Sequence, residues 1–225
     1  MTDAHCHAAK PGITNFVCEP FASRQNGGAG EGDAVFFGFH PWHLENFDAT
    51  ALKARLAANP AAGVGEIGLD RLRDKTICAA MREAFDAQLA IAAELRRPVV
   101  LHGAKCWGEV VRACRPYAGP GGIPSFLFHG FSRSAGLIPE IKAMNGFVGV
   151  GPALLNDHAV NYRRMVGNLP GDMLLAESDA CEPGATPGAE EVAGAIAGLR
   201  GWTVQKTIAL LDGNARRFLR GAAAT

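Results

Sequence analysis

Long apolar runs, an export signal and paired cysteines are all missing from this sequence. No segment approaches the roughly 20 consecutive apolar residues that a membrane helix needs, and the chain does not begin with a basic segment followed by an apolar one. The six cysteines are scattered and form no Cys-x-x-Cys pair, which argues against a zinc ribbon and against a disulfide framework. We therefore expect a cytoplasmic protein that does not enter the membrane.

An excess of one charge is also missing. Lys plus Arg and Asp plus Glu each number 22, so the net charge provides no general attraction for a polyanion. Any affinity for nucleic acid must come from a local site.

What the sequence does contain is an alternation of short apolar runs with helix-like segments. At 225 residues and 48% hydrophobic, the chain suffices for one buried core, and we expect a single domain over residues 1–225. Runs flanked by Gly or Pro predict eight strands, near residues 2–6, 14–19, 34–39, 63–69, 98–103, 125–130, 146–151 and 173–178. The alternation predicts an α/β fold, a compact (β/α)8 barrel of the TIM type with parallel strands.

Helices are predicted between most of these strands. The clearest is the segment 76–97, whose apolar residues recur at helical spacing and which Asp74 or Thr76 should cap. Further helices are predicted over residues 48–58, 106–116, 134–144, 158–168 and 189–199, and we expect Asn214 to cap the last helix. The segment between His7 and Asp33 has no room for two full helices, so the first helices of the barrel should be reduced or missing.

Side chains with metal-binding chemistry stand near the ends of five strands. His5 and His7 are two residues apart, so both point to one face of a strand and can bind one cation. Imidazoles and carboxylates follow on later strands, at Glu66, His102, His129 and Asp179. The C-terminal ends of barrel strands meet at one mouth, and this set exceeds the needs of one tetrahedral ion. It favours two divalent ions about 3.5–4 Å apart that share a carboxylate.

These residues lie in short motifs that resemble those of the TatD-like metal-dependent DNases, in the amidohydrolase-like superfamily of barrels. The similarity runs from Asp3 to Leu219 and is carried by DAHCH at 3–7, GFHP at 38–41, GEIGLD at 65–70, LHGAK at 101–105, FHGFS at 128–132, LLAESD at 174–179 and GNARRFL at 213–219. The resemblance implies hydrolysis of phosphodiester bonds in DNA, often stepwise from the 3′ end, with magnesium or another divalent ion.

The resemblance also implies which residues hold each ion. The first ion would be held by His5, His7, Glu66 and Asp179, and the second by Glu66, His102 and His129. We expect two divalent ions, with Mg²⁺, Zn²⁺ and Mn²⁺ all open because imidazole and carboxylate ligands suit several metals.

The chain departs from the pattern of the family at three places. The family usually has Gly-x-His-Pro-His, whereas here Trp42 occupies the position of the second histidine and His43 follows it. The loop after Asp179, ACEPGATPG, is short, and the acidic triplet is Glu-Ser-Asp where the family usually has Glu-Thr-Asp. These differences predict an open or differently furnished substrate site.

Roles in catalysis follow from the chemistry of the set. Asp179, Glu66 and His40 are the candidate catalytic residues: Asp179 as ligand and general base, Glu66 as shared ligand, and His40 as a contact to the substrate or proton donor, or else simply a turn-stabilising histidine. Glu177 either steers a histidine ligand or faces a helix. Three cationic residues are candidates for binding phosphate, namely Lys105, Arg133 and Arg71.

Two other functions remain open from the sequence. The same ligands could hydrolyse a small amide, ester or lactone, since activated water attacks acyl and phosphoryl centres alike, although such enzymes commonly carry a carboxylated lysine where this chain has Glu66. A non-catalytic metal-binding descendant is the other alternative. With hydrolysis as the main expectation, the substrate would be DNA ends or a small phosphodiester, and no obligatory protein partner is expected.

Overall fold

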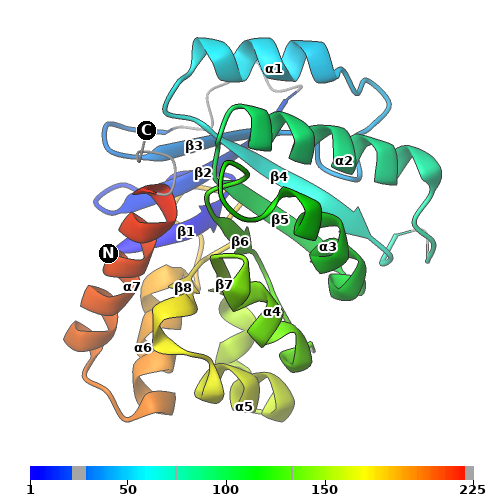
Figure 1. Ribbon diagram of the computed structural model, residues 1–225. Helices are drawn as coiled ribbons and strands as arrows, with labels where there is room; N and C mark the ends of the chain where they lie inside the picture. The colour runs from blue at the N-terminus through cyan, green and yellow to red at the C-terminus, as the bar shows by residue number, and fades with distance from the viewer. Residues whose placement is uncertain (22–28, 74, 133, 221–225) are drawn as a thin grey trace.

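The computed structural model describes residues 1–21, 29–73, 75–132 and 134–220. Its strands form one eight-stranded parallel sheet in the order of the sequence (Figure 1). They are β1 (Thr2–Cys6), β2 (Thr14–Pro20), β3 (Ala34–Gly38), β4 (Gly63–Asp70), β5 (Val99–Ala104), β6 (Phe126–Phe128), β7 (Gly146–Val150) and β8 (Leu174–Ala176). All eight predicted strands are confirmed, and no end is shifted by more than two residues.

Helices cover the outside of this sheet unevenly, as Figure 1 shows. They are α1 (Ala49–Ala58), α2 (Ala79–Glu94), α3 (Trp107–Cys114), α4 (Ile138–Ala143), α5 (Val160–Asn168), α6 (Ala189–Arg200) and α7 (Val204–Arg220). Among the described residues no helix precedes α1, which confirms the prediction of a barrel reduced at its start. None of the helices in the described ranges is both long and apolar enough to cross a membrane.

Two predictions about helix caps are wrong. Helix α2 begins only at Ala79, and the sulfur of Cys78 accepts the cap hydrogen bond from the Met81 N–H, so Thr76 does not cap it; Asp74 lies outside the described residues. Asn214 lies in the middle of α7 and is fully buried. Its side-chain amide donates to the carbonyls of Gly171 and Leu174, at 2.8 and 2.7 Å. It therefore anchors the start of β8 and caps no helix.

The interior of the barrel is apolar at one end. Phe218 from α7 contacts Phe16, Phe36 and Phe147, with ring centroids 5.6 to 6.0 Å apart. All four rings are almost fully buried. The carbonyl of Phe218 also accepts a hydrogen bond from the buried hydroxyl of Ser125, just before β6, so α7 is fixed to this end of the sheet.

The first and last strands meet through hydrogen bonds that lie beyond β8. The N–H of Ser178 donates to Asp3 Oδ1 at 2.9 Å, and the N–H of Asp179 donates to the carbonyl of His5 at 3.0 Å. The N–H of His7 in turn donates to the carbonyl of Ala180 at 2.8 Å. This seam brings the two ends of the sheet together where the candidate ligands lie, and confirms the barrel.

Candidate metal centre

The predicted ligands gather at the C-terminal ends of the strands. They form three overlapping groups of three residues, and within each group the ligand atoms lie within 4.8 Å of one another. They are His5, Glu66 and His129; His5, His7 and Asp179; and His40, Glu66 and His102. Every residue predicted as a ligand belongs to at least one group, and His40 joins them.

Glu66 lies at the centre of the cluster, on β4, and is 5% exposed. Its Oε2 atom is 3.5 Å from His5 Nε2 and 3.6 Å from His7 Nε2. Its Oε1 atom is 2.7 Å from His102 Nδ1 and 3.7 Å from His129 Nε2. One carboxylate thus presents a different oxygen to each of two imidazole pairs, which is the arrangement of a shared ligand.

Asp179 stands just beyond β8 with a positive φ of 56°, and the hydrogen bond from its N–H to His5 fixes this turn. Its Oδ1 atom is 3.3 Å from His5 Nε2 and 3.8 Å from both His7 Nε2 and His129 Nε2. About half of its side chain, 51%, is exposed. Asp179 therefore faces both the cluster and the solvent.

His129 is held by a buried carboxylate on its outer side. Its Nδ1 atom is 2.9 Å from Glu177 Oε1, which also accepts from the N–H of Gly130 at 2.7 Å. Glu177 is fully buried, and it occupies space that a side chain at position 149 would fill, since a Cβ on Gly149 would lie 1.9 Å from Glu177 Oε2. The contact leaves Nε2 of His129 facing Glu66.

His102 is held in a similar way by Asp70. The Nε2 atom of His102 is 2.9 Å from Asp70 Oδ2, and the indole N–H of Trp42 donates to the same oxygen at 3.0 Å. The other oxygen, Oδ1, accepts from the backbone N–H groups of Leu72 and Arg73. These donors outweigh the effect of burial and hold the pKa of Asp70 below its usual value. The ionised carboxylate leaves Nδ1 of His102 facing Glu66.

His40 completes the cluster on the side of Trp42. Its Nδ1 atom accepts a hydrogen bond from the N–H of Trp42 at 3.2 Å, and its Nε2 atom is 3.3 Å from His102 Nδ1. Burial lowers the pKa of His40 to about 4, so the imidazole is neutral at pH 7. The structure therefore places His40 among ligand atoms as well as near the open rim.

The donor set fits divalent cations. Both ring nitrogens of His5 are buried without a hydrogen-bond partner among the described residues, although Nε2 faces two carboxylates. Buried polar atoms of this kind are ordinarily satisfied, and an imidazole whose bare nitrogen faces carboxylate oxygens is a typical metal ligand. Two of the imidazoles around Glu66, those of His102 and His129, are also held by carboxylates on their outer sides. His7 Nδ1 lies 3.1 Å from the carbonyl of Cys18. Metal-binding histidines are commonly oriented in this way.

The ionisation of the cluster reflects the same crowding. Burial acts to raise the pKa of Glu66, but the imidazoles of His129, His5 and His102 hold it well below its usual range. Burial acts to lower the pKa of His129, yet Glu177 and Glu66 raise it to about 10. The pKa of His102 is also raised, by Glu66 and Asp70. The carboxylates thus draw positive charge to this point, whether protons or cations supply it.

The cationic residues predicted to bind phosphate are placed less centrally. Arg71 is paired with Glu109 at 2.5 Å, so part of its charge is already neutralised. Lys105 follows the end of β5 with a positive φ of 57° and is exposed. Arg133 lies outside the described residues.

Asp70 and Trp42 are the site residues that the sequence reasoning missed. A signal for Asp70 was available, because Glu66 and Asp70 are four residues apart on one strand and alternation places them on the same face. The sequence marks Trp42 as a departure from the family pattern but does not predict its contact with Asp70, which spans 28 residues of sequence.

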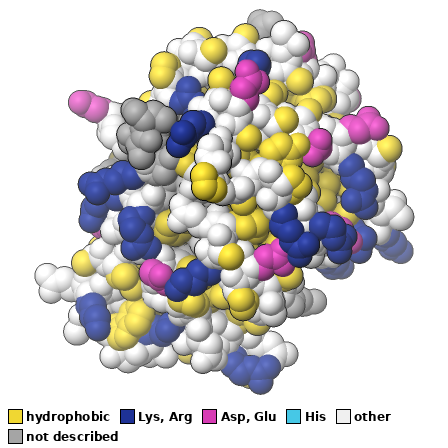
Figure 2. Space-filling model, in the orientation of Figure 1, with side chains coloured by type: hydrophobic (Ala, Val, Ile, Leu, Met, Phe, Trp, Pro, Cys, Tyr) yellow, Lys and Arg dark blue, Asp and Glu magenta, His cyan; other side chains and the backbone are white. Residues whose placement is uncertain are grey.

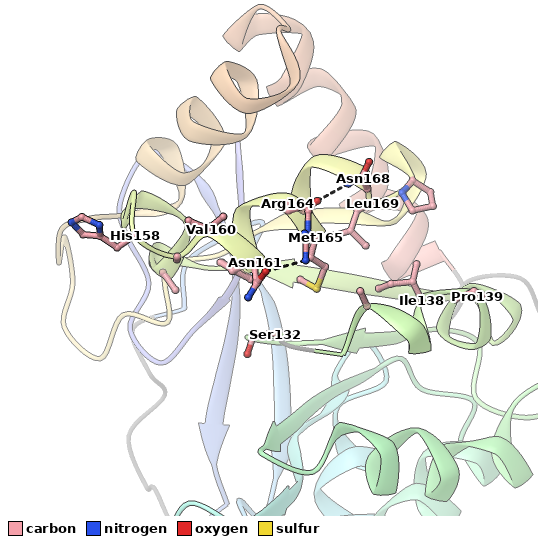
Figure 3. A pocket seen from close by; sticks show the side chains of 15 residues that line it. Ser132, Ile138, Pro139, His158, Val160, Asn161, Arg164, Met165, Asn168 and Leu169 are labelled. Atoms are coloured by element: carbon pink, nitrogen blue, oxygen red, sulfur yellow. Dashed lines mark hydrogen bonds between the residues drawn. The ribbon is translucent and has the colours of Figure 1, made fainter.

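A large groove lies away from the candidate ligands. It has a volume of about 1150 Å³, runs beside α5 and is lined mainly by apolar side chains, including Ile138, Met165 and Leu169 (Figure 3). It contains none of the candidate ligands. The groove forms where a short 3₁₀ turn, Ala135–Leu137, and the six-residue α4 replace the longer helix predicted over residues 134–144. We assign it no part in the metal centre.

Comparisons with known proteins find relatives over most of the chain. The family model described as "TatD related DNase" matches residues 27–220. A protein of Musicola paradisiaca named "3'-5' ssDNA/RNA exonuclease TatD" is 29% identical over 200 residues, which cover 81% of this chain and 75% of that protein. An "Uncharacterized metal-dependent hydrolase YabD" of Bacillus subtilis is 28% identical, over 81% of this chain and 76% of that protein. A relative of the same TatD name from Edwardsiella piscicida matches over only 56% of its own length.

Solved structures share the fold. The crystal structure of YJJV, a TatD homologue from Escherichia coli, superposes with a TM-score of 0.79 and 23% identity, and covers 96% of each chain. A TatD family hydrolase from Entamoeba histolytica superposes with a TM-score of 0.72 and 11% identity, over 92% of this chain and 85% of that one. Because these two structures are only 23% and 11% identical to the chain, the superpositions show that the fold is shared and nothing further.

Proposed function

Because the chain belongs to the family of TatD-related DNases, we propose that it is a divalent-metal-dependent nuclease that hydrolyses phosphodiester bonds at the ends of single-stranded DNA. The curated relatives named as exonucleases of single-stranded DNA and RNA support the class of substrate. The relative named as a metal-dependent hydrolase supports the requirement for a cation.

One observation carries the proposal, the position of Glu66 between two imidazole pairs. A first cation would be held by His5, His7, Glu66 and Asp179, and a second by Glu66, His102 and His129. When bound, two divalent cations neutralise charge on phosphoryl oxygens and make a nearby water more acidic. Mg²⁺, Mn²⁺ and Zn²⁺ all suit this mixture of imidazole and carboxylate.

Four side chains of the protein have further roles in the proposed hydrolysis. Asp179 is half exposed and ionised, because the imidazoles of His5 and His129 outweigh burial and lower its pKa. It can accept a proton from the attacking water. Glu177 and Asp70 each hold one histidine ligand in a fixed orientation. His40 lies 3.3 Å from His102, where it can contact a phosphoryl oxygen or the leaving group.

The test measures metal content and rate together. Glu66→Ala should reduce the metal content by more than one ion per chain and abolish hydrolysis, because both cations lose a ligand. His102→Ala and His129→Ala should each weaken the second cation and leave the first bound. Glu94→Ala is the matched control, since Glu94 pairs with Lys53 on the exposed surfaces of α1 and α2. A Glu66→Ala protein with two ions and full activity contradicts the shared-ligand assignment.

The substrate class is tested separately. Single-stranded oligonucleotides, duplexes and chromogenic phosphodiester, lactone and amide substrates are offered to the protein loaded with Mg²⁺, Mn²⁺ or Zn²⁺. We expect hydrolysis of phosphodiesters and the highest kcat/KM on single-stranded DNA ends. Faster hydrolysis of a lactone or an amide would overturn the proposal in favour of an amidohydrolase-type activity.

A further inference from the structure

Trp42 is an exposed tryptophan at the rim of the metal centre. Its ring centroid lies 4.9 Å from that of His40 and 6.2 Å from that of His102. The side chain is nevertheless 42% exposed. By contrast Trp107 is 5% exposed and packs against Phe128 and Phe131 in the core. Trp42 therefore leaves a large aromatic surface open to solvent beside the candidate catalytic residues.

The indole is held in place although it is exposed. Its N–H donates to Asp70, its backbone N–H donates to His40, and the guanidinium of Arg73 donates to its carbonyl at 3.4 Å. Asp70 itself is buried and accepts three further hydrogen bonds. A ring fixed in this way loses little conformational freedom when a ligand binds to it.

A second exposed apolar residue is bound to the same carboxylate through its backbone. The backbone N–H of Leu72 donates to Asp70 Oδ1 at 2.5 Å, and the side chain of Leu72 is 57% exposed. Trp42 and Leu72 are two of the five large hydrophobic residues that are exposed among the described residues, and both hydrogen-bond to the buried Asp70. The hydrogen bond to Asp70 explains the edge of the indole but not its exposed ring.

We propose that Trp42 is a stacking platform for the nucleobase next to the scissile phosphodiester bond. Stacking of a base on an aromatic side chain suits single strands of any sequence, because every base has a π face. Arg73 lies against the backbone of Trp42 and supplies a cation for the adjoining phosphate. The proposal deepens and rests on the proposed nuclease function, and it assigns a substrate contact to the position where the family usually has a histidine.

Two variants separate stacking from positioning. Trp42→Phe keeps an aromatic ring but lacks the donor to Asp70. Trp42→Gln keeps an N–H donor three bonds from Cβ, as in the indole, but lacks the ring. Trp42→Ala lacks both, and Trp202→Ala removes a tryptophan that follows α6 and contacts Arg200 and Lys206, so it serves as the control.

The substrates form a matched pair. One is a single-stranded tetranucleotide, and the other is the same tetranucleotide with an abasic terminal nucleotide. The wild-type protein should prefer the base-bearing end by about tenfold in kcat/KM, within the range for one stacked base, mainly through KM. The preference should fall below about twofold in Trp42→Ala and Trp42→Gln, and should persist in part in Trp42→Phe and in full in Trp202→Ala.

Fluorescence anisotropy with the same labelled oligonucleotides gives a readout that does not depend on turnover. The affinity difference between the two substrates should follow the same order among the variants. Equal kcat/KM for both substrates in the wild type overturns the stacking role without needing any variant. So does a preference that survives in Trp42→Gln but not in Trp42→Phe, since Trp42 would then act only through Asp70. If the wild type cleaves neither substrate, the nuclease function itself fails.

Discussion

His129 and His102 both face Glu66, and each is held by a carboxylate on its other ring nitrogen. The two carboxylates lie in different surroundings. Glu177 binds His129 inside the barrel, where the carboxylate is fully buried and Gly149 provides its space. Asp70 binds His102 at the rim, where the same carboxylate also accepts hydrogen bonds from the indole N–H of Trp42 and the backbone N–H of Leu72. We call His129 and Glu177 the enclosed pair, and His102 and Asp70 the rim pair.

The difference separates two tasks. The enclosed pair makes its contacts with the barrel itself, so its geometry is as rigid as the core around it. The rim pair joins His102 to exposed residues at the edge of the cluster through one carboxylate. Under the proposed function, we expect the enclosed pair to serve metal binding and the rim pair to connect metal binding with substrate recognition.

The largest expected effect in this comparison concerns Asp179, which belongs to neither pair and faces both the cluster and the solvent. Asp179→Asn keeps the size of the side chain and one oxygen ligand but removes its charge and basicity. If general base catalysis contributes its usual share, kcat should fall by about 10²–10⁴-fold with little change in KM. The measurement is steady-state kinetics at saturating metal. A decrease in kcat of less than about threefold is far below the usual contribution of a general base. It would show that Asp179 only stabilises the turn after β8.

A direct comparison of the two pairs comes next. Glu177→Gln and Asp70→Asn each replace an acceptor of a histidine N–H by a neutral amide, and changes of this kind cost about 10–100-fold in metal affinity or activity. We expect Glu177→Gln to reduce metal affinity and lower the Tm, because Glu177 packs against Gly149 inside the barrel and holds His129 there. Asp70→Asn should mainly alter KM.

Metal titrations and thermal unfolding of both variants test this division, with Glu94→Gln as the control on the exposed surface. Equal effects on Tm and KM in the two variants contradict the distinction between an enclosed and a rim pair.

The pH dependence of metal binding sharpens the comparison further. The pKa of His129 is raised to about 10, so the metal-free protein holds a proton there at pH 7 that a cation must displace. Raising the pH removes this competing proton, so metal affinity should increase with pH, by up to about tenfold per pH unit for each proton released. Calorimetry in buffers of different ionisation enthalpy counts the protons. The count should fall by about one in His129→Ala, and an unchanged count contradicts the assignment.

The smallest effect is the expected response of substrate binding to salt. The chain has no net charge, and Figure 2 shows its Lys and Arg side chains in separate groups on the face in view. Few phosphate contacts predict a loss of affinity below about tenfold between 50 and 200 mM salt, where proteins with many contacts lose about 10³–10⁵-fold. Anisotropy of a labelled single strand measures it. A steep loss would indicate a long cationic track.

Much of the fold was readable from local patterns. The strands are predictable because most of them are short apolar runs flanked by Gly or Pro. The reduced start of the barrel is predictable because the segment between His7 and Asp33 has no room for two full helices. The cap of α2 was misjudged since a cysteine, a weak acceptor, accepts the hydrogen bond. Asn214 was misjudged because its partners are carbonyls near β8, about 40 residues away in sequence.

The candidate site was readable to a lesser depth. The positions of ligand types at strand ends predicted the set that the structure brings together around Glu66. The partners that orient these ligands depend on which atoms face each other across strands, and no sequence spacing reports this for Trp42 and Asp70. The sequence allows two roles for Glu177, because its contact with His129 depends on the space that Gly149 leaves.

The seam between β1 and β8 has a consequence for how the protein holds together. Asp3 and Ser178 are 175 residues apart in sequence, so the contacts across the seam close a loop that contains most of the chain. Closing so long a loop carries a substantial entropic cost, and any ligand that binds only the closed form offsets part of it. His5 and Asp179 come from the two sides of this seam. A cation bound by both residues would link the two sides of the seam, so that the barrel could open there only if the cation were released.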